Sequence, residues 1–281
     1  TFTRTSTDAA NEINCFTSGS ASSHTLIYDN NVSSGPFGNA YGNSTNSFGG
    51  SLENCDWSNN TIGTGLLIAE PLELDGGMVN ARAWGNKSNQ TTGTSTSLSS
   101  NAPVLQGPLY IFRNAFRSTV ANTTGIKNGN YANGWVFFFH NSLETVATGG
   151  NEAIGEAGGT PYSENHTYRN NIFKASGTIY FHQGRSNTYN YDLAFSSTGG
   201  DYSTLWNEGS PHATLAAFQS ATGQELNGLY GDPLYLNTAL ETSTTSPGYN
   251  AGVSLANFND STSAWPARGA APDMGYFEYQ E

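Results

Sequence analysis

The sequence predicts an all-β fold: a parallel β-helix of about 28 residues per coil over residues 1–195, closed by an irregular segment over residues 196–281. Three observations carry this prediction. Aromatic residues recur at a nearly constant spacing, 33 glycines accompany many Asn, Ser and Thr residues, and a single short helical pattern occurs near the C-terminus. Glycine, Asn, Ser and Thr are poor helix formers, so the repeat must be built from strands and turns.

The repeat is defined by an aromatic residue that stands two positions before an asparagine. Its six aromatic members are 29, 27, 28, 27 and 29 positions apart. In a β-helix, equivalent residues stack at the strand spacing of about 4.8 Å. We therefore expect an inward aromatic column and a ladder of asparagines at one corner. The pairs are Tyr28 with Asn30, Trp57 with Asn59, Trp84 with Asn86, Phe112 with Asn114, Phe139 with Asn141, and Tyr168 with Asn170.

Each coil carries further apolar positions. One follows the asparagine by two or three residues, as in Ile62, Phe116, Leu143 and Phe173. Phe2 stands 26 positions before Tyr28 and is expected in the same aromatic column, so the stack either begins uncapped or has its cap in sequence that precedes residue 1. An unpaired solenoid edge needs a cap or a partner, which predicts self-association through residues 1–30.

The C-terminal segment begins with a helical pattern, Thr214-Leu215-Ala216-Ala217-Phe218-Gln219-Ser220, in which Thr214 is a suitable N-cap. Three glycine- and proline-containing stretches follow, at 231–236, 246–252 and 269–279. With the coil repeat, this order resembles the secreted bacterial right-handed parallel β-helix proteins of the pectate-lyase-like superfold. The resemblance implies a right-handed helix and a role in polysaccharide binding or cleavage, whereas the usual N-terminal capping helix is missing.

Composition excludes several classes of function. The net charge is −12, and the ten cations are too few and too scattered for nucleic-acid binding. No apolar run is long enough to span a membrane. Cys15 and Cys55 allow at most one disulfide. Eight Asn-x-Ser/Thr sequons and only three lysines favour an extracellular or cell-surface glycoprotein.

One column between the aromatic and the asparagine is expected to face outward. It presents Arg113, His140 and Arg169 on three consecutive coils. This column is either a solvated face balanced by glutamates or a strip that recognises an anionic sugar. In the second case His140 is the candidate general base, because a neighbouring Arg lowers the imidazole pKa.

Acidic residues supply two further candidate sites. Glu144, Glu152, Glu156 and Glu164 lie in or near a glycine-rich loop that could form a substrate-binding wall, hold Ca²⁺, pair with the arginines, or be simply solvated. Glu73 and Asp75 share a strand face about 7 Å apart. That spacing suits the carboxylates of an inverting glycosidase or a Ca²⁺ site, or the pair has no function at all.

Two functions remain open. The first is an extracellular protein that binds or cleaves an anionic polysaccharide along a lateral groove, as a polysaccharide lyase or glycoside hydrolase if it is an enzyme. The second is a non-catalytic subunit of an extracellular fibre or surface stalk, which assembles through its uncapped N-terminal coil. The sequence contains no Gly-His-Gly, Asn-Thr-Asp or Arg-x-Pro-x-x-Arg motif, which leaves catalysis undecided.

Overall fold

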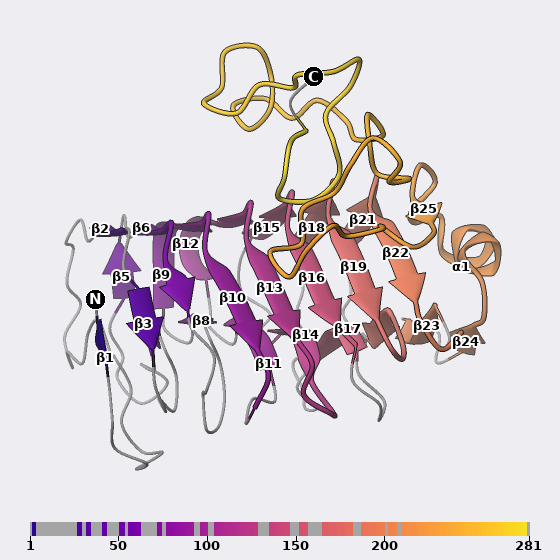
Figure 1. The fold of residues 1–281 in the computed structure, drawn as a ribbon, viewed down its shortest axis with the longest axis horizontal. Coiled ribbons are helices and arrows are strands. Elements are labelled where there is room, and N and C mark those ends of the chain that lie inside the picture. Colours follow the sequence, from indigo (N-terminus) through magenta and orange to yellow (C-terminus); the bar gives the residue numbers. More distant parts are fainter. Residues whose placement is uncertain are drawn as a thin grey trace.

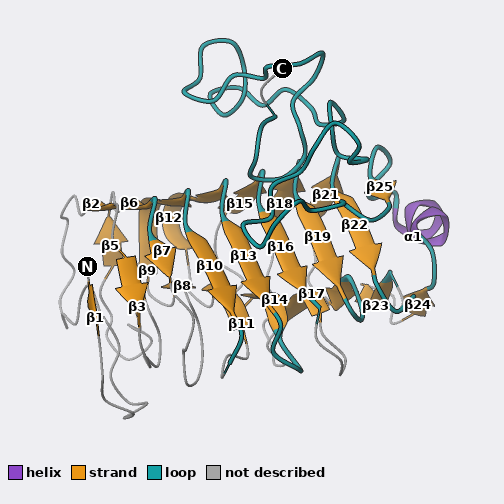
Figure 2. Ribbon diagram, in the orientation of Figure 1, coloured by secondary structure: helices purple, strands orange, loops and turns teal. Residues whose placement is uncertain are grey.

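A computed structural model places three parallel sheets along one axis and a long C-terminal segment on their side (Figures 1 and 2). The structure describes residues 2–3, 27–29, 32–34, 41–43, 51–53, 56–62, 72–74, 77–92, 96–100, 104–128, 135–146, 152–156, 165–181, 187–199, 202–206 and 210–279. Cys15, Cys55, Asn30, Asp75 and Glu164 lie outside these residues.

Each coil contributes one strand to each of three sheets, here named A, B and C. Sheet A contains β1 (Phe2–Thr3), β3 (Val32–Ser34), β7 (Thr61–Ile62), β10 (Lys87–Gln90), β13 (Ala115–Ser118), β16 (Ser142–Thr145), β19 (Ile172–Ala175), β22 (Leu193–Ser196) and β25 (Leu229–Tyr230). Sheet B contains β4 (Tyr41–Asn43), β8 (Leu72–Leu74), β11 (Thr96–Ser100), β14 (Thr124–Asn128), β17 (Glu152–Glu156), β20 (Tyr180–Phe181), β23 (Ser203–Trp206) and β24 (Ser210–His212). Sheet C contains β2 (Ile27–Asp29), β5 (Ser51–Glu53), β6 (Asp56–Ser58), β9 (Gly77–Trp84), β12 (Val104–Phe112), β15 (Trp135–Phe139), β18 (His166–Arg169) and β21 (Thr188–Asn190).

Strand pairing confirms the parallel β-helix. Every pair is parallel except β23 with β24. The stacking continues past residue 195, because β25 pairs with β22. Phe2 belongs to sheet A, where it pairs with Ser33, so the expectation that it extends the aromatic column of sheet C was wrong.

The inner column of sheet C contains Trp57 and Tyr168 as predicted, whereas Trp84, Phe112 and Phe139 were wrongly placed in it and stand one position after the inward residue. It consists of Trp57, Ala83, Ile111, Phe138, Tyr168 and Tyr189, all of them buried. Phe138, Tyr168 and Tyr189 stack face to face, with ring centroids 4.5 and 4.3 Å apart. Trp84, Phe112 and Phe139 form the next column along the strands. Their side chains point away from the coil interior, because successive side chains of a strand point to opposite faces.

The corner ladder is present, with two members shifted. Its rungs are Asn60, Asn86, Asn114, Asn141 and Asn171, and it ends at Asp192. Each side-chain amide donates to the next rung over 2.8–3.0 Å. Asn59 and Asn170, predicted as rungs, instead each stand one residue before a rung, Asn60 and Asn171, and have positive φ.

The residue before each rung turns the chain in the left-handed region. Asn59, Gly85, Arg113, His140, Asn170 and Tyr191 all have φ between 52° and 67°. At Gly85 a Cβ atom would lie 2.4 Å from the side-chain oxygen of Asn59, so a larger residue there would displace that side chain. We name this set the corner column. It includes two of the predicted site residues, Arg113 and His140.

Sequon accessibility follows from this geometry. Asn86 and Asn259 are each 1% exposed and hydrogen-bonded through their side chains, which leaves no room for a glycan. Asn89 lies in β10, where its side-chain oxygen accepts a hydrogen bond from Arg117. Asn122 and Asn165 are exposed, which makes them the sequons best placed for modification among those with described side chains.

The two parts of the C-terminal segment have different roles. Helix α1 (Leu215–Thr222) confirms the predicted helix, and the Thr214 hydroxyl accepts a hydrogen bond from the backbone N–H of Ala217. Its Phe218 packs against Tyr180 and Tyr202 and covers the last coil. The chain after α1 runs back along the side of the coils (Figure 1).

This returning tail, residues 231–279, packs on sheet A and on the corner column. Met274 contacts Ile172 and Leu193, and Leu240 contacts Ala115. The N–H of Gly275 donates to the backbone oxygen of Asn170. Gly275 has φ of 90°, and a Cβ atom there would lie 2.6 Å from the Ser142 hydroxyl, so only glycine allows this contact. The tail thus forms a ridge along one lateral face.

Candidate functional site

A crevice lies where the tail meets the corner column. Its volume is about 290 Å³, near the lower end of the range for small-molecule pockets. The coils contribute Asn59, Trp84, Gly85, Lys87 and Arg113. The tail contributes Ala264, Trp265, Pro266, Arg268, Tyr276, Phe277 and Glu278.

Positive charge gathers in this crevice although the chain carries a net charge of −12. Three of its ten cations, Lys87, Arg113 and Arg268, line the walls beside one carboxyl group, that of Glu278. Lys87 and Arg268 are exposed, and neither has a carboxylate within salt-bridge distance among the described residues. Two cations are therefore available to an incoming anion.

Aromatic rings form the other part of the wall. Trp84 and Trp265 meet edge to face, with centroids 5.1 Å apart. Both are half-buried, and the Trp84 indole N–H donates to Asp56 over 2.7 Å, which fixes its ring. Rigid aromatic faces beside cations can hold the apolar face of a ring-shaped ligand together with its charged group.

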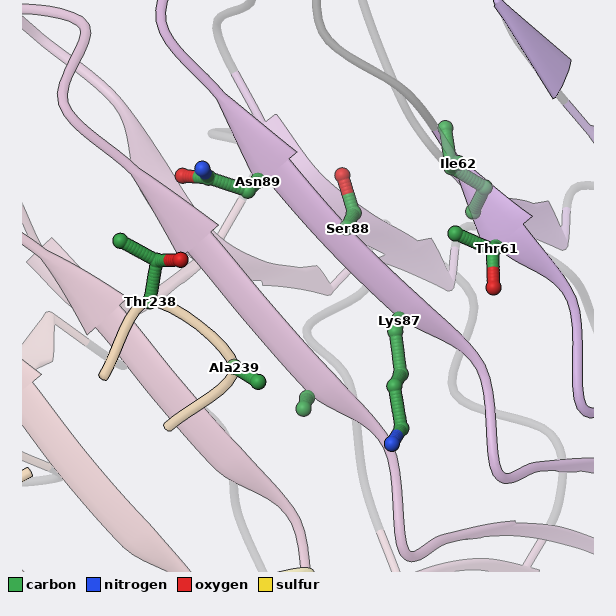
Figure 3. Close-up of a pocket in the computed structure, with 8 residues that line it drawn as sticks. Thr61, Ile62, Lys87, Ser88, Asn89, Thr238 and Ala239 are labelled. Atoms are coloured by element: carbon green, nitrogen blue, oxygen red, sulfur yellow. The ribbon is translucent and has the colours of Figure 1, made fainter. Parts of the chain in front are cut away.

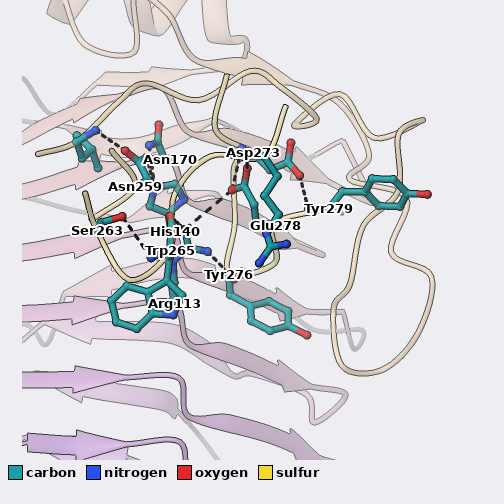
Figure 4. A network of polar contacts seen from close by, with 12 residues as sticks. Arg113, His140, Asn170, Asn259, Ser263, Trp265, Asp273, Tyr276, Glu278 and Tyr279 are labelled. Atoms are coloured by element: carbon teal, nitrogen blue, oxygen red, sulfur yellow. Dashed lines mark hydrogen bonds and ion pairs between the residues drawn. The ribbon is translucent and has the colours of Figure 1, made fainter. Parts of the chain in front are cut away.

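Arg113 and Glu278 hold the floor of the crevice in place (Figure 4). The Arg113 guanidinium donates to the backbone oxygens of Tyr276 at 3.1 Å and Trp265 at 3.4 Å, and lies 4.0 Å from the Glu278 carboxylate. Burial lowers the pKa of Arg113 to about 10, which keeps it charged at neutral pH. Burial also raises the pKa of Glu278. Arg113 therefore anchors the tail, and its exposed fraction of 6% leaves little of it for a ligand.

His140 is buried beneath the tail, with an exposed fraction of 1%. Its Nε2 lies 2.7 Å from the Asn259 amide nitrogen and 3.1 Å from that of Asn170. The Val253 backbone fixes the Asn170 amide, because its N–H donates to the side-chain oxygen and its C=O accepts from the nitrogen. The same C=O accepts from Asn259.

Both amide nitrogens therefore donate to Nε2, which must be unprotonated. Burial, followed by the charge of Arg113, lowers the pKa of His140 well below 6.5. Arg113 and His140 point outward from the coils as predicted, but the expectation that they form an exposed strip was wrong, because the tail covers both. Arg169 lies in the column of Phe139 instead, half-buried, and donates to the backbone oxygen of Tyr168.

Of the four glutamates of the predicted acidic wall, the structure describes the side chains of Glu144 and Glu152, which lie on different sheets. Glu144 is 7% exposed and is bound on sheet A between Arg117, at 2.6 Å, and Lys174, at 3.4 Å. Glu152 lies in sheet B, where the Thr124 hydroxyl donates to its carboxylate over 3.4 Å. Burial raises the pKa of Glu152 to about 7.

The structure gives the strand position but not the side-chain environment of Glu156 and Glu73. Glu73 pairs with Ser99 in sheet B. Among the described residues, no group of three or more His, Cys, Asp or Glu side chains is arranged to hold a metal ion. The Ca²⁺ suggestions at Glu73 and Asp75 therefore stay predictions.

Sequence reasoning missed most of the crevice. Trp84 was assigned to the coil interior, and Lys87 and Arg268 were not considered. No charge pattern along the chain marks these two cations, because Arg113, Lys127 and Arg169 likewise have no acidic residue within four positions. The position of the tail on the lateral face was not foreseeable, because the tail is not periodic.

Comparison with known proteins adds no family. The chain matches no family model, no curated protein and no solved structure. In the described part of the chain, no helix is long and apolar enough to cross a membrane.

Proposed function

We propose that this protein is an extracellular, polysaccharide-associated β-helix that binds an acidic sugar in the crevice between its tail and its coils. The proposal rests on one crevice of an acidic chain, in which Lys87 and Arg268, which have no carboxylate partner among the described residues, lie beside two indole rings. A uronate or sulfated sugar offers both an anionic group and a ring face, so it fits this combination.

Binding is favoured over catalysis. His140, the candidate base, accepts hydrogen bonds from two amides under the tail and has no path to a substrate proton. Glu278, the carboxyl group that lines the crevice, accepts from the backbone N–H groups of Arg268 and Asp273 and lies next to Arg113. The resemblance to pectate-lyase-like proteins supports a role at polysaccharide, not a particular reaction.

Titration of the protein with acidic and neutral glycans tests this proposal, with tryptophan fluorescence as the readout because two of the five tryptophans line the crevice. We expect saturable binding of uronate or sulfated glycans that weakens with salt. Arg268→Met should reduce affinity about fivefold, as for one exposed ion pair. Lys127→Met, the same charge change on sheet B, should have no effect. Equal binding of neutral glycans, or an Arg268→Met variant indistinguishable from the parent, would contradict the proposal.

A parallel assay for reducing ends and unsaturated products separates binding from cleavage. The proposal expects no product from glycans that bind. Turnover that survives His140→Gln would require a different catalytic group from the one predicted by sequence.

A further inference from the structure

A second cavity of about 300 Å³ adjoins the crevice (Figure 3). It lies over the same three coils, on the first residues of β7, β10 and β13. The crevice is floored by Asn59, Gly85 and Arg113, and the second cavity by the residues two positions later: Thr61, Lys87 and Ala115. These three are paired in register on sheet A. Thr238 and Ala239 of the tail form its outer wall.

Lys87 belongs to both cavities. Its ammonium group lies 5.1 Å from the centre of the Tyr276 ring, itself part of the crevice wall. The two cavities are therefore neighbours that share the exposed side chain of Lys87. Two strand residues span about 7 Å, so ligand groups in the two cavities would lie one short linkage apart.

The chemistry of the two cavities differs. The accessible surface of the second cavity is mostly apolar, with Ile62, Ala115 and Ala239 among its lining residues. Among the described residues that line it, Lys87 carries a charge and none carries a carboxyl group. This lining suits the ring face of an uncharged part of a sugar, with an acidic group turned toward Lys87.

We infer that the two cavities are adjacent subsites for one chain, so that the ligand is an acidic oligosaccharide of at least two units, with Lys87 as the residue that selects for its charge. The inference rests on the proposed function and deepens it. It turns a site of single-sugar size into one that recognises a linkage between two sugars.

Calorimetric titration with uronic acids of one, two and three units, prepared from alginate and from pectate, tests this inference. We expect the affinity to rise about tenfold from one unit to two. Ala239→Phe should fill the second cavity, abolish that gain and leave binding of the single unit unchanged. Lys87→Met should weaken binding of the two-unit ligand about fivefold or more and remove its preference over a neutral disaccharide. Lys127→Met serves as the matched charge control.

The outcomes separate the inference from the proposed function. If the single unit binds as tightly as the longer ligands, and Ala239→Phe changes nothing, the second subsite is overturned while acidic-sugar binding stands. If neutral and acidic disaccharides bind equally to the parent, the role of Lys87 is overturned. If no uronate or sulfated ligand of any length binds, the proposed function fails and the inference fails with it.

Discussion

Replacing Asp192 by Asn should make the protein more stable at neutral pH and reduce the pH dependence of its stability. Asp192 ends the asparagine ladder and is fully buried. Its Oδ1 accepts from the backbone and side chain of Asn171 at 2.7 and 2.9 Å, whereas its Oδ2 has no hydrogen-bond donor. Glu225, also fully buried, accepts from the Asp192 N–H and from the Tyr180 hydroxyl.

The two carboxyl groups need a proton between them. Burial raises the pKa of Asp192 from 3.8 to about 6, and burial together with the charge of Asp192 raises that of Glu225 well above 4.5. A protonated Glu225 can donate to the orphaned Oδ2 of Asp192. Tyr202 and Arg169 also act on this pair, the first as a neighbouring hydroxyl and the second as a nearby cation.

The sign of the pH dependence follows from the raised values. A carboxyl group that holds its proton more tightly in the folded state stabilises the protein fully at low pH and loses that contribution as pH rises through its folded pKa. For Asp192 the difference of about two pKa units corresponds to about 3 kcal/mol, lost between about pH 4 and pH 7. Asp192→Asn removes this term. The new amide can accept from Asn171 as before and donate to Glu225.

Guanidinium unfolding of the parent and Asp192→Asn at about pH 5 and pH 8, followed by tryptophan fluorescence, measures the effect. We expect the variant to gain about 1–3 kcal/mol at the higher pH and little at the lower. Glu225→Gln should flatten the profile in the same way. Asp260→Asn is the control, because hydrogen bonds from Thr262 lower the pKa of that exposed carboxyl and confine its effect to acid. An Asp192→Asn variant that is less stable than the parent at pH 8, or equally pH-dependent, would refute the shared proton.

Three further predictions follow from the register and the tail. Asn114→Ala breaks the ladder in both directions and should lower the free energy of unfolding by about 3–5 kcal/mol. Asn59→Gly, one residue before a rung, should lower it by less than about 1 kcal/mol. Equal losses in the two variants would refute the corrected register. Phe112→Ala should speed proteolysis of the tail, because Phe112 contacts Phe258 and Trp265. Ile111→Ala should instead lower the free energy of unfolding by about 2–5 kcal/mol without freeing the tail. Tail cleavage at the same rate in both variants would contradict this division. Acidification below about pH 6.5 should loosen the tail and speed its proteolysis. The reason is that the pKa of His140 is lowered while the tail covers it, so that only the unfolded or detached form takes up the proton there. His140→Gln should abolish this acid-induced cleavage, and cleavage that persists in the variant would point to another group.

The period of the coil was predictable from sequence, but its phase was not. Two adjacent positions at the corner both favour asparagine: the left-handed residue, which tolerates positive φ, and the ladder rung, which needs an amide. The doublets Asn59-Asn60 and Asn170-Asn171 fill both positions, so spacing alone cannot separate them. In the same way Phe137, Phe138 and Phe139 offer three consecutive aromatics, and only pairing with Tyr168 shows that the middle one is inside.

The candidate site depends on where the tail packs, which the repeat of the coils does not predict. Once the register is known, the alternation of side chains along a strand correctly directs Phe112 and Phe139 away from the coil interior. The same rule predicts that their rings are exposed to solvent. Phe258 and Trp265 of the tail cover those rings instead. Arg113 and His140 are likewise directed outward from the coil and buried by the tail. Outward direction and solvent exposure are separate properties wherever a second layer packs on a solenoid.

The buried Asp192–Glu225 pair and His140 act at different places and with opposite signs. As pH falls from about 7 to 5, the Asp192–Glu225 pair strengthens the last coils, while His140 begins to weaken the attachment of the tail. A single denaturation curve would show these terms partly cancelled. Proteolysis of the tail and unfolding of the coils should therefore separate on acidification, with the tail released first. Because the crevice is walled by that tail, its loss should abolish binding of an acidic sugar before the coils unfold. Simultaneous loss of tail protection and coil structure at every pH would show that the two parts form one cooperative unit, and would remove the basis for treating the tail as a separable wall.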